Sequence, residues 1–338
     1  MHFFIDEGGT FTATAGWSAV CSLALPHKEV GPARREIDFI SRKWPRRDGE
    51  LKGGSLSADH LKALVEVLFR HDAILHVCAI DMAQENPDDI ERHKAGQCEG
   101  ITNYLAPSHH PNFVAEVQGL RKALERIPAQ LYVQCVLMSE LIETAIEENL
   151  MYFAQRRPRE LGRFEWTIDA KDPVRISPQE AWWRDTLGPL QESKTRDKPM
   201  RFVRDPAFDY RYFNKNFMFE KELWHPDKPR ELIQGYDVRK VISGQISFVD
   251  SRSETLIQAV DILTSFMRRW LANEISDDDV TRSLGRLQIL KNNGGKPQSL
   301  QLATLSRKTG MRKSKLKANS MALAGRVMMK PGRGKKAA

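Results

Sequence analysis

The feature that most constrains this chain is a helix that is apolar nearly all round. Residues 246–249 predict a short strand that ends at Asp250, and Ser251 or Ser253 can cap the helix that follows. The first half of this helix is apolar at Leu256, Ile257, Val260, Ile262 and Leu263. A helix with this pattern is buried in the interior of a domain.

Asp261 lies inside this apolar helix, on one stripe with Gln258 and Ser265. A buried carboxylate is costly unless a partner compensates its charge. One interpretation is structural: Asp261 pairs with an arginine or caps a neighbouring helix. The other is that Asp261 faces a metal ion together with carboxylates from distant parts of the chain. The helix pattern alone does not decide between the structural and the metal-binding interpretation.

Other acids follow predicted strands. The chain starts with a strand over residues 3–5, then Asp6-Glu7 and Gly8-Gly9, and a second β-rich run, which predicts a hairpin. The continuous apolar run 73–80 predicts a strand covered on both faces, and it ends at Asp81. The run 163–169 predicts a further strand that ends at Asp169.

These motifs resemble a known family. Its pattern is an N-terminal strand ending in Asp-Glu-Ser-Gly, a middle strand ending in Asp, and a C-terminal Asp-Ser followed by Gln-x-x-Asp. The matching residues are Asp6-Glu7-Gly8-Gly9, Asp81, Asp250-Ser251 and Gln258-Ala259-Val260-Asp261. Over roughly residues 1–272 the chain resembles domain-of-unknown-function family 3800, a divergent relative of the ribonuclease H-like (retroviral-integrase-type) superfamily. Gly8 departs from the serine usual in the family.

The resemblance implies an α/β fold with a ribonuclease H-like mixed central sheet flanked by helices. Residues 50–53 can form a third strand or an extended edge. Counting them as a third strand and 73–81 as the fourth, the resemblance implies that Asp6 and Asp81 lie on adjacent parallel strands. We assign residues 1–272 to this domain, with a helical block at 112–155 and an aromatic and charged insertion at 173–240. A helical extension (273–305) and a disordered basic tail (306–338) follow.

The four acids suggest metal-dependent phosphodiester chemistry, in which carboxylates converge on Mg²⁺ or Mn²⁺. We predict Asp6, Asp81, Asp250 and Asp261 as catalytic metal ligands, with Glu7 and Asp169 as reserves. Ser251 and Gln258 are predicted to orient these ligands from behind.

The positive charge is concentrated at the C-terminal end. Of the 52 Lys and Arg, 11 lie in residues 301–338, which hold no Asp or Glu, so residues 1–300 carry 41 basic and 44 acidic residues. Such a segment predicts electrostatic binding of DNA or RNA, although a solubilising or localising tail has the same composition. The predicted contact residues are Arg307, Lys308, Arg312, Lys313, Lys315 and Lys317.

The insertion 173–240 interleaves aromatic and basic residues, among them Trp182, Trp183, Tyr210 and Tyr212. Such residues can stack on bases, or they can build a small core of their own, and the many acids here favour the core.

No apolar run is long enough to span a membrane, and the four scattered cysteines suit reduced thiols of a cytoplasmic protein. The sequence thus predicts a metal-dependent nuclease linked to mobile elements or phage defence. The alternatives are a catalytically inactive nucleic-acid-binding protein and a metal-dependent hydrolase of nucleotides or other small phosphates.

Overall fold

Six strands form the central mixed sheet in the computed structural model. The structure describes residues 1–330 except 14, 171–175, 199, 201, 204, 226–227, 294–295 and 307–317. In spatial order the strands are β10 (Gln301–Ala303), β3 (Ile74–Asp81), β2 (Trp17–Leu25), β1 (His2–Gly8), β4 (Glu165–Asp169) and β7 (Ile246–Val249).

The strand directions divide the sheet into two halves. Strands β1, β2 and β3 form an antiparallel meander, whereas β4 and β7 run parallel to β1. Every residue of β2 is buried, as expected for a strand covered on both faces. The carboxyl ends of β1, β4 and β7 therefore meet at one edge of the sheet.

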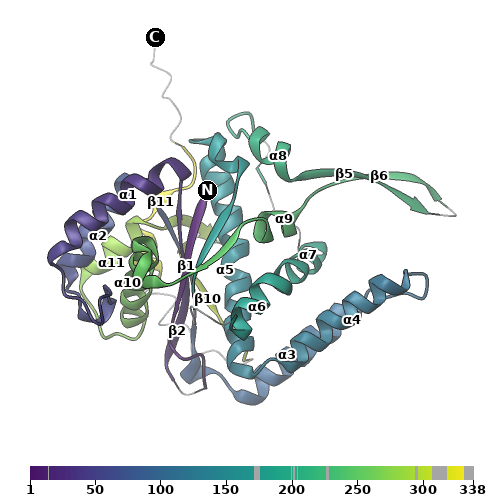
Figure 1. The fold of residues 1–338 in the computed structure, drawn as a ribbon, viewed down its shortest axis with the longest axis horizontal. Helices are drawn as coiled ribbons and strands as arrows, with labels where there is room; N and C mark the ends of the chain where they lie inside the picture. The colour runs from purple at the N-terminus through teal and green to yellow at the C-terminus, as the bar shows by residue number, and fades with distance from the viewer. Residues whose placement is uncertain are drawn as a thin grey trace, which may run out of the picture.

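Two groups of helices cover the two faces (Figure 1). The first face carries α1 (His27–Ile40), α2 (Ala58–Arg70), α10 (Thr255–Leu271) and α11 (Asp278–Arg286). The second carries the long helix α5 (Ala129–Ala154), with α6 (Pro178–Asp185), α7 (Leu187–Asp197), α8 (Arg211–Phe217) and α9 (Val238–Ser243). This confirms the predicted α/β class, with a mixed central sheet flanked by helices.

Two antiparallel pairs project from the second side (Figure 1). One is the helical hairpin of α3 (Pro87–Thr102) and α4 (Pro111–Arg126), and the other is the two-stranded ribbon of β5 (Met218–His225) and β6 (Lys228–Tyr236). No helix in the described part of the chain is long and apolar enough to cross a membrane.

The predicted strand at residues 50–53 is wrong. This segment is a loop that enters a short 3₁₀ turn, η2 (Gly53–Ser55). Residues 74–81 therefore form the third strand of the sheet, and the parallel neighbour of β1 is β4.

The helical block over 112–155 is confirmed as α4 and α5, which are separated at Ile127 and Pro128. In the insertion 173–240 the small-core interpretation is confirmed for five aromatic residues, because they are buried in the same core cluster as α5 and β4. These are Trp182, Trp183, Phe208, Phe213 and Phe217. Trp183 is fully buried, so its ring cannot stack on a base.

The expectations for the C-terminal region are partly wrong. The extension 273–305 begins with α11, but it continues as β8 (Ile289–Asn293), β9 (Lys296–Gln298) and β10, which joins the central sheet beside β3. Within the predicted disordered tail (306–338), residues 318–330 are folded. Met321 and Ala322 are fully buried, and β11 (Arg326–Val327) pairs with β8. The apolar residues among the charges provide this packing.

Candidate active site

Two carboxylates lie at the adjacent carboxyl ends of β1 and β4. Ile5 is in register with Ile168, so Asp6 and Asp169 are the next residues on neighbouring parallel strands. Asp6 is only 4% exposed. Burial raises the pKa of the Cys21 thiol, opposite Asp6 on β2, to about 12, and the charge of Asp6 contributes to the rise. Asp6 and Cys21 therefore lie on the face of the sheet that α10 covers. Ile168 lies on the opposite face, so Asp169, the next residue of the strand, lies on the same face as Asp6.

Helix α10 brings the third carboxylate to this edge. It packs across β1 and β4, and a β-carbon at Gly8 would lie 3.0 Å from Cγ2 of Thr264. Asp261 lies one turn before Thr264 and lines a cleft together with Ala170, which follows Asp169. A side chain at position 8 would therefore crowd Thr264 on the helix.

The loop before η2 supplies a cation to the same cleft. Lys52 forms an ion pair with Glu50 at 2.5 Å. Although partial burial lowers the pKa of Lys52, the bond to Glu50 and the charge of Asp261 raise it above its ordinary value. The charge of Asp169 acts in the same direction, so the field of both acids reaches the Lys52 ammonium.

Gly53 seats this loop on α10. A β-carbon at Gly53 would lie 2.5 Å from Cβ of Ser265 and 3.1 Å from Cα of Ile262, so only glycine fits without displacement. Glu50 and Lys52 were missed in the sequence analysis. The signal that could have found them is the Gly53-Gly54 pair, which marks a close backbone approach directly after two charged residues.

The cleft between this loop, the turn after β7 and α10 has a volume of about 690 Å³. Its lining is mostly charged and includes Arg47, Glu50, Lys52, Asp250, Arg252 and Asp261. This size suits a ligand such as a nucleotide, and the lining suits a charged one.

Gln258 and Ser251 hold the walls of the cleft together. The Gln258 amide accepts a hydrogen bond from the Leu51 N–H at 3.1 Å and donates one to the Ser251 carbonyl at 2.7 Å. The Ser251 hydroxyl donates to Glu50 at 3.1 Å. Both residues thus position Glu50 and the loop backbone, and their predicted role in orienting metal ligands stays a prediction.

Asp250 lies at this cleft but has local partners. It accepts a hydrogen bond from the Arg252 N–H at 2.9 Å, which caps the short turn η5 (Ser251–Ser253), and it pairs with the Arg252 guanidinium at 2.5 Å. The bonds to Arg252 lower the pKa of Asp250 to about 2. Its predicted role as a metal ligand stays a prediction, and the structure gives it a positioning role.

The structure does not bring Asp81 to this site. Asp81 pairs with Trp17 on β2, whereas Asp6 pairs with Cys21, four residues further along the same strand. At about 3.3 Å per residue, Asp81 is displaced by about 13 Å along the strands and lies two strands away. It caps a short turn by accepting from the Ala83 N–H. The error follows from counting 50–53 as a strand, and Asp169, predicted only as a reserve, takes the expected place.

Glu7, the other reserve, points to the opposite face. Burial raises the pKa of Cys135 on α5 well above its ordinary value, and the charge of Glu7 contributes. Glu7 therefore faces α5, across the sheet from Asp6. The predicted nucleic-acid contacts, Arg307, Lys308, Arg312, Lys313, Lys315 and Lys317, lie outside the described residues.

Comparison of the chain with protein-family models, curated proteins and solved structures found no match. The resemblance to family 3800 therefore stays a prediction, and the function has to be argued from the site.

Proposed function

We propose that this protein is a metal-dependent nuclease with a ribonuclease H-like fold, and that Asp6, Asp169 and Asp261 are its metal-binding residues. The observation that carries the proposal is that Asp6 and Asp169 end neighbouring parallel strands, and that α10 crosses the same edge and carries Asp261, which lines an open charged cleft.

The strand arrangement supports the ribonuclease H-like assignment. That fold combines an antiparallel meander of three strands with two further strands parallel to the first. The order β3-β2-β1-β4-β7, with these directions, has this form. The proposed acids come from the first strand, the fourth strand and the helix after the fifth.

The donors are of the chemical type that a hard divalent cation prefers. Mg²⁺ and Mn²⁺ prefer carboxylate oxygens, with the remaining positions taken by water and substrate phosphate. Two of the donors come from strands and one from a buried helix, so their spacing is set by packing. An ion held by these carboxylates would supply positive charge against the phosphate and would lower the pKa of bound water.

The other cleft residues bind and orient the substrate in this proposal. Lys52 presents an ammonium group for a phosphate oxygen, and Glu50 holds it in place. Arg47 and Arg252 add positive charge at the rim of the cleft. Gln258 fixes the two loops that carry these groups.

A metal-dependent hydrolase of nucleotides is the second candidate, because a cleft of about 690 Å³ also fits a single nucleotide. The predicted link to mobile elements or phage defence, the cytoplasmic location and the choice between DNA and RNA remain predictions.

The test is cleavage of labelled single- and double-stranded DNA and RNA, and of mononucleotides, with Mg²⁺, Mn²⁺ or chelator. Asp169→Asn should abolish metal-dependent cleavage, and the matched control Asp81→Asn should retain it. Cleavage of mononucleotides alone would favour the second candidate. Cleavage by the Asp169→Asn protein equal to that of wild type would overturn the proposed site.

A further inference from the structure

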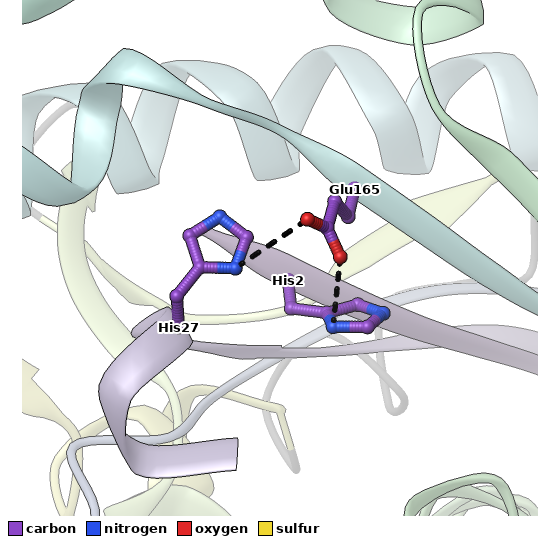
Figure 2. A group of neighbouring side chains, drawn as sticks. All are labelled: His2, His27 and Glu165. Atoms are coloured by element: carbon purple, nitrogen blue, oxygen red, sulfur yellow. Dashed lines mark ion pairs between the residues drawn. The ribbon is translucent and has the colours of Figure 1, made fainter.

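A second cluster of possible ligands lies at the other end of the same two strands. His2 begins β1 and is in register with Glu165, which begins β4, while His27 begins α1 (Figure 2). His2 and Asp6 share one face of β1, four residues apart, so this cluster lies about 13 Å from the acids.

The separations in this cluster are too long for hydrogen bonds. Nδ1 of His2 lies 3.5 Å from Oε2 of Glu165, and Nδ1 of His27 lies 3.9 Å from Oε1 (Figure 2). Zinc bonds of about 2.0–2.2 Å at tetrahedral angles place ligand atoms about 3.3–3.6 Å apart. An octahedral ion with similar bonds would need about 3.0 Å. The 3.5 Å separation between His2 and Oε2 lies in the tetrahedral range, whereas the 3.9 Å separation of His27 is measured to the other oxygen, Oε1. One ligand atom from each of the three residues lies within 4.8 Å of the other two.

The hydrogen bond at Nε2 of His27 determines which ring nitrogen carries the proton. Nε2 lies 3.3 Å from the carbonyl oxygen of Arg163, which can only accept, so Nε2 carries the hydrogen. Nδ1 therefore presents a lone pair toward Glu165.

A chain of hydrogen bonds gives His2 the same orientation. Its Nε2 lies 2.7 Å from the Thr167 hydroxyl, which lies 3.1 Å from the Ser247 hydroxyl, and Ser247 donates to the Trp166 carbonyl. Because that carbonyl can only accept, Ser247 donates to it and accepts from Thr167, and the Thr167 hydroxyl accepts from Nε2–H of His2. The lone pair of the His2 ring is therefore at Nδ1. A hydroxyl and a carbonyl behind the rings are the usual partners that orient metal-binding histidines.

Two imidazole lone pairs and a carboxylate thus face one another with no proton between them. We propose that His2, His27 and Glu165 form a Zn²⁺ site with three protein ligands and a fourth position open to water. Arg163 lies 2.5 Å from Oε1 of Glu165, so it neutralises one oxygen and leaves Oε2 toward His2. The three side chains are 16–27% exposed, so the ion can enter from solvent.

The site is independent of the proposed nuclease centre, and it has a defined chemistry. It joins the starts of β1, β4 and α1, so an ion there would stabilise the sheet. Nitrogen ligands favour Zn²⁺ over Mg²⁺ more strongly than carboxylates alone do.

The test is titration of the full chain, without a polyhistidine tag, with Zn²⁺ by calorimetry and thermal melting. We expect one equivalent to bind and raise the melting temperature, and Co²⁺ in its place to give the intense visible absorption of a tetrahedral ion. His27→Gln should abolish both effects. Thr167→Val, which removes only the hydroxyl behind His2, should weaken binding about 10–100-fold.

The controls separate this site from other zinc ligands. His109→Gln removes a surface histidine, and Asp261→Asn removes an acid of the other centre, so both should bind Zn²⁺ like wild type. Equal binding by wild type and the folded His27→Gln protein would overturn the proposal, as would loss of binding in Asp261→Asn.

Discussion

Replacing Gly53 by alanine tests whether the cationic loop is seated on α10 as described. The new β-carbon would lie 2.5 Å from Cβ of Ser265 and 3.1 Å from the Ile262 backbone. The helix backbone cannot retreat, because the buried side chains of Ile262 and Leu263 hold it. The loop must therefore lift, and the bond from the Leu51 N–H to Gln258 is strained or lost.

The magnitude follows from two contributions. Overpacking a tight contact costs about 1–3 kcal/mol, and the lost hydrogen bond adds about 1 kcal/mol. Alanine also restricts the unfolded chain, which stabilises by about 0.4–1 kcal/mol. Gly54→Ala is the matched control, because a β-carbon there meets nothing within 4 Å, and both changes restrict the unfolded chain alike. The free energies of unfolding of the two variants should differ by about 2–4 kcal/mol.

The assay is urea unfolding of both variants, monitored by circular dichroism at equal protein concentration. If Gly53→Ala proved as stable as Gly54→Ala, the close approach of the loop to α10 would be refuted. The assignment of Glu50 and Lys52 to the cleft would then lose its structural basis.

Three further predictions concern charges. Burial lowers the pKa of His76 to about 3. On acidification His76 is therefore protonated at a higher pH in the unfolded state than in the folded state. Stability should therefore fall as the pH drops from about 6.5 toward 3, by up to about 1.4 kcal/mol per pH unit from this group, and pH-dependent unfolding of His76→Gln should show a shallower slope. Lys52→Met should slow cleavage yet tighten Mn²⁺ binding several-fold in calorimetry, because a competing cation is removed; weaker Mn²⁺ binding would contradict this. The last variant carries glutamine at the six basic positions 307, 308, 312, 313, 315 and 317. Its slope of log K against log salt for duplex DNA binding should be smaller by up to about 5 units. An unchanged slope would exclude these residues from binding.

The sequence predicted the fold class because its strands and buried helix carry strong hydrophobic patterns. The apolar run at 73–80 matches β3, and the apolar helix expected after Asp250 matches α10. Strand order was harder to predict, since it depends on which runs pair. One false strand at 50–53 moved Asp81 into the place that Asp169 occupies.

The site was predicted in part, for physical reasons. Asp6 and Asp261 could be found because each interrupts an apolar segment, where a carboxylate is costly. Glu50 and Lys52 lie in an irregular loop without periodicity, so only the glycine pair hinted at their position. The face to which Glu7 points follows from the register of β1, which no local pattern reveals.

The central claim is that Asp6, Asp169 and Asp261 share divalent metal, and Mn²⁺ titration by calorimetry tests it most directly. Wild type and Asp81→Asn should bind Mn²⁺ alike and gain melting temperature from it. Asp261→Asn should lose binding while its apoprotein stays at least as stable as wild type, because repulsion among the acids is relieved. An Asp261→Asn apoprotein destabilised by about 3–5 kcal/mol that still binds Mn²⁺ would show Asp261 to be a structural ion-pair partner and would contradict the account.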